Sequence, residues 1–277
     1  ESNVKVLLAA HIDEIGLIIE EILDNGICKL TNVGAIKPEM YVGQKVNVVK
    51  FTNNSYNYIP GVICYKGNGT NEKPSVRDLI LDLGTFSKEE TLKHVSIGDV
   101  VIHQDNITYL ENNLISSKAL DDKIAVYICC EVLKKLKNQT KNGVYFASTV
   151  GEETTGRGSI FTTSMVNPTL SITLDVGSSS DVSYYNGSIR DVTLGKGPMF
   201  TIASNGSEML CNLLKETANK HNIPYQEVVE YSKTYTDFDT LYKQNGGIPS
   251  TLISIALRYM HSSIEVGSLN DVEYIIN

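Results

Sequence analysis

Two adjacent carboxylates, Glu152 and Glu153, lie in the stretch STVGEETTG, directly after the apolar run VYFASTV. Adjacent acids at the end of a buried strand repel each other and resist desolvation, so a nearby cation is needed to stabilise them. Bound metal ions supply such local positive charge. In such a pair, one glutamate can bind metal while the other takes a proton from a water molecule.

Other predicted strands and one predicted helix also carry potential metal ligands at their ends. They are His11 and Asp13 after VKVLLAA, Asp175 near the end of SITL, His261 after STLISIALRYM, and Asp121 and Asp122 at the start of a helix. Each residue alone is more simply explained as a satisfied histidine, a helix cap or a solvated acid. In an open α/β sheet, however, ligands bind at the carboxyl ends of the strands, so we expect these side chains to converge there.

The charges of this set match two divalent cations. Asp121, Glu153 and Asp175 contribute three negative charges, the two imidazoles are neutral, and a bridging hydroxide would add a fourth negative charge. Nitrogen and carboxylate ligands without sulfur favour zinc, with cobalt or manganese as substitutes. Asp13 lies two residues from His11, which suits a partner that fixes the imidazole tautomer.

The elements that must position these residues fall into two classes. Residues 20–113 contain short β-type runs separated by Gly, Asn, Asp and Pro, which predict a small all-β domain, a barrel or a sandwich. Residues 1–19 and 114–277 alternate strand with helix, as in the helical run ALDDKIAVYICCEVLKKLKN. This pattern predicts an α/β domain with a mainly parallel mixed sheet flanked by helices, into which the β domain is inserted.

Composition narrows the classes of function. The 277 residues carry a formal net charge of −8, which argues against a nucleic-acid or anionic-membrane partner. No apolar run is long enough to span a bilayer, and nothing in the sequence leads us to expect secretion. The five cysteines show no CxxC spacing, so we expect buried free thiols in a cytoplasmic protein.

Five motifs occur in a specific order: HIDEIGLII, ALDDKIA, TVGEETTGRGS, TLDVG and RYMHSSIEV. Together they resemble the tetrahedral (TET) aminopeptidases, dinuclear metallopeptidases also labelled glutamyl aminopeptidase or endoglucanase M. The resemblance extends over essentially the whole chain and includes RDLILDLG and SLNDVE. It implies a zinc-exopeptidase-like catalytic domain that removes N-terminal residues from short peptides. It also implies that the inserted domain mediates dimerisation and that six dimers form a hollow tetrahedral dodecamer.

The resemblance also implies a ligand role for five residues. One metal would be bound by His11 and Asp175, and the other by Glu153 and His261. Asp121, the first acid of the LDD motif, would bridge the two metals.

Three further implications concern the chemistry around the metals. Glu152 would be the general base that deprotonates a water bridging the metals. Asp13 would orient His11, and the Asp121–Asp122 peptide would be cis.

The chain departs from the family pattern in three places. It begins at Glu1, and a segment that usually precedes the first strand of the catalytic domain is expected to be missing. Tyr235, Thr236 and Asp237 replace a usual Gly-Thr-Asp, and the loop at 177–187 lacks a usual Pro-Gly. Both substitutions are expected near the substrate pocket, so they leave the preferred N-terminal residue open.

Other functions compete with the aminopeptidase hypothesis. Related dinuclear scaffolds carry deacylases and carboxypeptidases, which cleave a different amide. A non-catalytic metal-binding or assembly protein would be expected to have lost a ligand or the base, and here the full set is present. A glycosidase needs two separated carboxylates that flank a sugar, unlike the adjacent pair Glu152 and Glu153.

Overall fold

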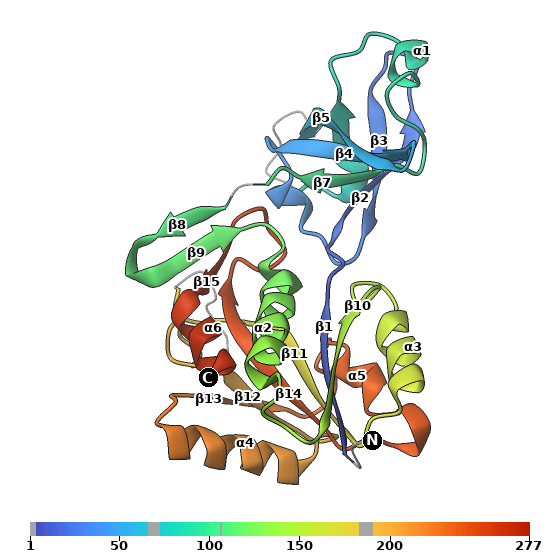
Figure 1. Ribbon diagram of the computed structural model, residues 1–277. Helices are drawn as coiled ribbons and strands as arrows, with labels where there is room; N and C mark the ends of the chain where they lie inside the picture. Colours follow the sequence, from blue (N-terminus) through green and yellow to red (C-terminus); the bar gives the residue numbers. More distant parts are fainter. Residues whose placement is uncertain (1–3, 66–72, 106, 183–190) are drawn as a thin grey trace.

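Two units make up the protein: a large mixed sheet flanked by helices and a small closed β-barrel (Figure 1). The computed structural model describes residues 4–65, 73–105, 107–182 and 191–277. The predicted class, an α/β domain with a small all-β unit, is confirmed.

The large sheet is parallel in its centre and antiparallel toward one edge. Its main order is β10-β1-β11-β14-β15-β9-β8, and β12 pairs with both β13 and β14. The pairs β1–β10, β1–β11 and β11–β14 are parallel, whereas β14–β15, β15–β9 and β8–β9 are antiparallel. The strands are β1 (Lys5–His11), β8 (Thr108–Leu110), β9 (Leu114–Ser117), β10 (Gly143–Thr149), β11 (Leu170–Ser178), β12 (Met199–Ala203), β13 (Gln226–Glu230), β14 (Ser250–Arg258) and β15 (Glu265–Ser268).

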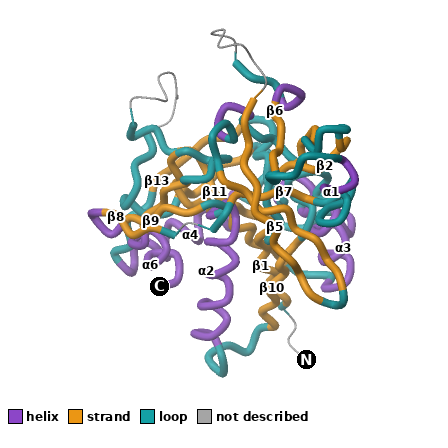
Figure 2. Tube along the Cα trace, turned by 90° about the horizontal axis from the view of Figure 1, so that it is seen from above, coloured by secondary structure: helices purple, strands orange, loops and turns teal. Residues whose placement is uncertain are grey.

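Strand β1 is buried on both faces, which explains its continuous apolar sequence. Leu8 and Ala10 pack toward helix α2, whereas Leu7 and Ala9 pack in a separate cluster. Helices α2 and α6 pack together over one face of the sheet, and α3 and α5 pack together over the other. Seen from above, β1 and β10 run between α2 and α3 (Figure 2). The helices are α1 (Lys88–Thr91), α2 (Leu120–Leu136), α3 (Arg157–Val166), α4 (Glu208–His221), α5 (Phe238–Leu241) and α6 (Leu269–Ile276).

The barrel closes in the strand order β2-β3-β6-β5-β4-β7 around an apolar core that includes Leu17, Ile63 and Leu81. Its strands are β2 (Gly16–Ile22), β3 (Cys28–Val33), β4 (Lys45–Thr52), β5 (Ser55–Tyr65), β6 (Leu79–Asp82) and β7 (Val100–His103). The first barrel strand thus begins before the predicted boundary at residue 20. The run ITYLE, expected in the β domain, contains β8, which instead pairs with β9 in the large sheet. An antiparallel hairpin can extend the exposed edge of a sheet, and the local sequence does not reveal which sheet it joins.

The cysteines are free, as expected, but burial does not apply to all of them. Cys28, Cys129 and Cys211 are buried, whereas Cys64 and Cys130 are exposed. Cys130 follows Cys129 directly on α2, and consecutive helical residues point in different directions, so only one of them faces the core. None of the helices in the described part of the chain has the length and apolar character that a membrane span requires.

Candidate active site

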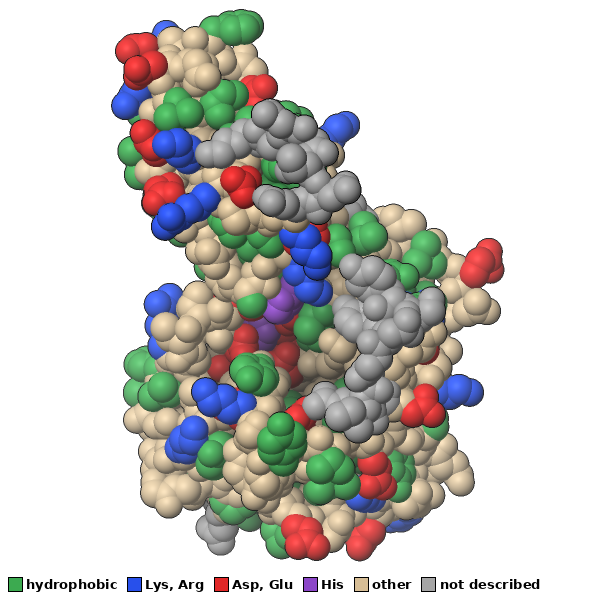
Figure 3. All heavy atoms as spheres, turned by 180° about the vertical axis from the view of Figure 1, so that it is seen from behind, with side chains coloured by type: hydrophobic (Ala, Val, Ile, Leu, Met, Phe, Trp, Pro, Cys, Tyr) green, Lys and Arg blue, Asp and Glu red, His purple; other side chains and the backbone are tan. Residues whose placement is uncertain are grey.

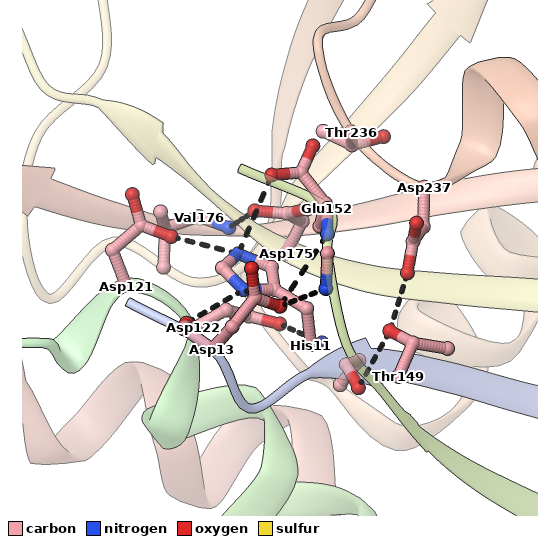
Figure 4. Close-up of polar contacts among 12 residues, drawn as sticks. His11, Asp13, Asp121, Asp122, Thr149, Glu152, Asp175, Val176, Thr236 and Asp237 are labelled. Carbon is pink, nitrogen blue, oxygen red and sulfur yellow. Dashed lines mark hydrogen bonds and ion pairs between the residues drawn. The ribbon is translucent and has the colours of Figure 1, made fainter. Parts of the chain in front are cut away.

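The residues predicted to do chemistry lie together at the carboxyl ends of the central strands (Figure 4). The side chains belong to His11 at the end of β1, Asp13 just after it, Asp121 at the start of α2, Glu152 and Glu153 after β10, Asp175 in β11, and His261 after β14. The parallel register aligns these ends, since His11 pairs with Thr149, the last residue of β10. The predicted convergence on one rim of the sheet is what the structure contains.

Asp121 lies at the centre of this cluster. Its Oδ1 atom is 3.1 Å from Nε2 of His11, and its Oδ2 atom is 3.3 Å from Nε2 of His261. Candidate ligand atoms of His11, Asp121 and Asp175 all lie within 4.8 Å of one another, as do those of Asp121, Glu153 and His261. One carboxylate therefore belongs to two adjoining groups, an arrangement suited to two metal ions that share a ligand.

These two groups are called half-sites below. The first half-site is His11 with Asp175, the second is Glu153 with His261, and Asp121 belongs to both. A third group joins His11 with Glu152 and Glu153, so ligand spacing by itself does not decide which glutamate binds metal.

Two hydrogen bonds orient His11, one to a residue far away in the sequence and one to a residue close by. Its backbone N–H donates to Oδ2 of Asp122 at 3.1 Å, and its ring Nδ1 lies 3.0 Å from the backbone oxygen of Asp13. The Asp13 carboxylate is farther from the ring, at 3.7 Å, and accepts instead from the N–H of Gly151 at 2.8 Å. Asp13 therefore contacts His11 mainly through its main chain, and its carboxylate stabilises the turn before Glu152.

Glu265 contacts the backbone of two residues of the second half-site, and the sequence analysis did not identify it. Its side chain accepts hydrogen bonds from the backbone N–H of His261 at 2.8 Å and of Asp121 at 3.1 Å. Only 2% of Glu265 is exposed. The sequence signal that could have identified Glu265 is its position shortly after His261 in the motif RYMHSSIEV. The spacing does not show which groups its side chain contacts.

Asp237 is a second buried acid that sequence reasoning did not assign to the site. It accepts a hydrogen bond from the hydroxyl of Thr149, which ends β10 immediately before the turn that carries Glu152 (Figure 4). Its other oxygen, Oδ1, has no hydrogen-bond partner among the described residues. Asp237 belongs to the Tyr235–Asp237 departure from the family pattern, where Tyr235 is 82% exposed and Thr236 is buried.

The second departure, the loop at 177–187, lies partly outside the described residues. In its described part, Asp181 accepts two hydrogen bonds from the guanidinium of Arg258, at 3.0 and 2.7 Å. The described part of this loop is therefore anchored on β14 by an ion pair.

Burial among other carboxylates raises the pKa values of three acids of the cluster. Burial would also raise the pKa of Asp121, but its contacts with His11 and His261 outweigh this and lower the pKa to about 2. Burial is the main cause for Glu152, whose pKa rises to about 7; His11 opposes the shift and Asp237 adds to it. Burial and the charge of Asp121 raise the pKa of Glu153 to about 8. Burial also raises the pKa of Asp175 well above its usual range. Divalent cations would supply positive charge that keeps these buried carboxylates ionised.

A cleft with a volume of about 660 Å³ opens over the cluster. Its walls include the acids of the site together with apolar side chains such as Met199, Val228 and Leu252. In the view from behind, histidine and acidic side chains are visible at the floor of a hollow between the two units (Figure 3). Its volume lies within the range of ligand pockets in proteins, and candidate metal ligands line it.

Comparison with known proteins decides the family. The model of the M42 glutamyl aminopeptidase family matches residues 1–277. The chain belongs to this family. It is 33% identical to a putative aminopeptidase of Acetivibrio thermocellus over 275 residues, which cover 97% of this chain and 79% of that relative.

Solved structures agree with this assignment. An aminopeptidase from the archaeon Desulfurococcus kamchatkensis has a TM-score of 0.91 and 31% identity, with 100% of this chain and 78% of that chain covered. The TET1 peptidase of Pyrococcus horikoshii has a TM-score of 0.85 and 30% identity, with 100% and 82% covered. The resemblance to TET aminopeptidases is thereby confirmed, and the protein is a metal-dependent aminopeptidase, a hydrolase of peptide bonds. A deacylase or carboxypeptidase activity is not favoured.

The residues of the cluster fit the divalent ions that the family implies. The donors are imidazole nitrogens and carboxylate oxygens, the ligands that suit zinc, cobalt and manganese. Two donor groups share Asp121, and burial raises the pKa of Asp175, so a bound cation would stabilise the ionised form of this carboxylate. The peptide between Asp121 and Asp122 is cis, as the resemblance implied.

Proposed function

We propose that this chain removes N-terminal residues from short peptides at a site with two metal ions and Glu152 as the general base. One observation carries the proposal: the two carboxylate oxygens of Asp121 face two different imidazoles, those of His11 and His261. A carboxylate whose two oxygens face different imidazoles can join two ions that each take one of these histidines.

In this proposal, His11 and Asp175 bind one ion, Glu153 and His261 bind the other, and Asp121 bridges them. Zinc is the expected ion, with cobalt or manganese as alternatives, because the donors are nitrogen and oxygen. When bound, the ions would lower the pKa of a water molecule and polarise the scissile carbonyl.

Glu152 is the acid best suited to proton transfer. Its carboxylate lies 3.9 Å from His11 Nε2 and lines the cleft, and burial brings its pKa to about 7. A base with a pKa near the working pH can accept a proton from the attacking water and deliver it to the leaving amine. Asp13 contributes by accepting from the N–H groups of Gly151 and Glu152, which fixes the turn that aims this carboxylate.

The proposal extends to assembly and location. We propose that residues 20–113 form a dimerisation domain and that dimers assemble into a tetrahedral dodecamer. The TET1 peptidase of Pyrococcus horikoshii can assemble into a tetrahedron or a large octahedral shell, which supports homo-oligomerisation here. Exposed aromatic residues on β4 and β5 supply apolar surface for such contacts, since Phe51, Tyr56 and Tyr58 are each more than half exposed. Free thiols agree with a cytoplasmic location.

The replacement Glu152→Gln tests the general base. It keeps the side-chain volume and removes the proton acceptor, so we expect hydrolysis of aminoacyl-anilides to fall about 10²–10⁴-fold. Metal content by elemental analysis should stay at about two ions per chain. The matched control, Glu216→Gln on the exposed surface of α4, should keep full activity.

Full activity of Glu152→Gln would contradict the assignment of the base. A parallel panel of N-acyl amino acids checks the reaction class. Cleavage of the acylated compounds alone would contradict aminopeptidase chemistry at this site.

A further inference from the structure

The turn that carries His261 has an unusual backbone. Tyr259 and His261 both have positive φ angles, of 58° and 65°, although neither is glycine. Non-glycine residues in this region cost about 1–3 kcal/mol each and persist only where surrounding contacts enforce the conformation. The position of the His261 imidazole therefore depends on the groups that surround the turn.

Contacts from the catalytic unit fix the turn on one side. Glu265 accepts the backbone N–H of His261 at 2.8 Å, and the imidazole Nε2 faces Asp121 at 3.3 Å. These contacts fix the backbone N–H and the ring Nε2 of His261. The carbonyl of Met260 and the Nδ1 atom of His261 have other partners.

Those partners come from the barrel unit. The backbone oxygen of Ala35 accepts from Nδ1 of His261 at 2.8 Å, and Nζ of Lys37 donates to the backbone oxygen of Met260 at 2.8 Å. A third contact joins Ser263 to Gln44 at 3.4 Å. The segment after β3 thus contacts Met260 and His261, even though more than two hundred residues separate Lys37 from Met260 in the sequence.

The same segment also touches the other ligand of the second half-site. Gly34 has a φ of +71°, and a Cβ atom there would lie 3.3 Å from Oε2 of Glu153 and 2.7 Å from Cγ2 of Ile15. Glycine suits this position because of its positive φ and because a Cβ atom would lie too close to Ile15 and tight against Glu153. The barrel segment 34–37 therefore borders both Glu153 and His261.

The first half-site has different neighbours. His11 ends β1, and its backbone N–H donates to Asp122 on α2. Asp175 lies within β11, and the backbone N–H of Val176 donates to its carboxylate at 2.7 Å. Its ligands are positioned by the sheet and by α2 of the catalytic unit.

We propose that Lys37 is a positioning residue, through which the position of the barrel affects the geometry of the second half-site. Its ammonium fixes the Met260 carbonyl, and this keeps the Tyr259–His261 turn in the conformation that directs the imidazole toward Asp121. The inference rests on the proposed function, because it assumes that Glu153 and His261 bind the second ion. Lys37 makes the shorter of the two side-chain contacts from the barrel, at 2.8 Å compared with 3.4 Å for Gln44; the Ala35 contact uses only the main chain.

The test is a zinc titration of the full chain in competition with a chromophoric chelator, which resolves the affinities of two ions. Loss of an outer partner of a metal ligand typically weakens metal affinity 10–100-fold. In Lys37→Met we expect about a tenfold weaker second ion and an unchanged first ion. Lys37→Arg retains a charged donor and should restore the second affinity.

The matched control is Lys29→Met, which removes an exposed lysine of the same unit that pairs with Glu21 at 2.7 Å. Both of its ion affinities should equal those of the unaltered chain. Equal second-ion affinity in Lys37→Met and the unaltered chain would overturn the positioning role, as would an equal loss for both ions. A single ion in the unaltered chain would overturn the two-metal proposal itself, and this inference with it.

Discussion

The two half-sites are built differently although they share one carboxylate. His11 and Asp175 belong to strands and are 1% and 5% exposed. Glu153 and His261 lie in turns after strands, and the His261 side chain is 22% exposed. The register of the parallel sheet positions the first half-site, whereas contacts from loops and from the barrel position the second.

The site therefore combines a half-site on regular strands, which is rigid, with a half-site on turns, which can adjust. Ligands on regular elements are held more accurately than ligands on loops. We therefore expect the ion at His11 and Asp175 to bind more tightly than the ion at Glu153 and His261. The second ion should respond to changes in Glu265, Lys37 and the orientation of the barrel.

The largest expected effect comes from Asp121→Asn, which changes the residue common to both half-sites. The amide replaces one carboxylate oxygen, so one of the two imidazoles loses its anionic neighbour. Because a direct ligand changes, affinity for at least one ion should fall by more than about 100-fold, the upper end for changes one shell further out. Zinc titration and peptide hydrolysis measure the outcome. Two ions bound with unaltered affinities would refute the shared-ligand geometry.

A smaller and more selective effect is expected from Glu265→Gln. The Glu265 carboxylate accepts hydrogen bonds from two backbone N–H groups, those of His261 and Asp121. In the variant, the NH₂ group of glutamine replaces one accepting oxygen, so one of these N–H groups loses its acceptor. A buried donor left without an acceptor costs about 1–3 kcal/mol of folding stability. The second ion should bind about 10–100-fold more weakly, as for other outer partners of metal ligands.

The control for Glu265→Gln is Asp271→Asn. Asp271 is a buried acid that accepts the N–H groups of Gly195 and Gly197, at 2.8 and 2.7 Å, away from the site. Its replacement should lower the free energy of unfolding similarly but leave both ion affinities unchanged. Equal losses of ion affinity in the two variants would mean that Glu265 acts through overall stability alone.

The smallest effect is expected from Glu14→Gln in the linker between the two units. Burial alone would raise the pKa of Glu14, but hydrogen bonds from Lys118 and Lys123 outweigh it and lower the pKa. Both lysines lie 2.8 Å from the carboxylate. Removing the charge should cost about 1.5–3 kcal/mol of folding stability near neutral pH, the range for hydrogen bonds to charged groups.

The pH dependence of this variant follows from the lowered pKa. The contribution of Glu14 is present above the ordinary glutamate pKa of about 4.3 and is lost as the pH falls through the folded value. Denaturant unfolding of the two chains should therefore differ at pH 6–8 and converge in acid. A difference that grows toward low pH would contradict the ion pair.

Much of the first half-site was predictable from the sequence. The continuous apolar run before His11 indicated a buried strand, and the rule that ligands gather at strand ends brought Asp175 to the same rim. The pattern of turns likewise indicated the small β unit. These features are local, because hydrophobic periodicity and turn residues are written in neighbouring positions.

The supports of the site were not predictable, because they join residues that are far apart in the sequence. Asp237 contacts Thr149 across the sheet, and Lys37 reaches Met260 from another unit. Asp13 was expected to orient His11, and the sequence could not show that its backbone oxygen makes the closer contact with the ring. Spacing gives residue type and element, whereas the choice between a main-chain and a side-chain contact depends on tertiary geometry.

Anomalous diffraction at the zinc edge from crystals soaked in zinc tests the two-metal account most directly. The account predicts two peaks per chain, about 3.5–4 Å apart, with Asp121 between them. One peak should lie beside His11 and Asp175 and the other beside Glu153 and His261. When the zinc concentration of the soak is lowered, the peak beside His11 should persist after the other has disappeared. A single peak, or two peaks that do not share Asp121, would contradict the account.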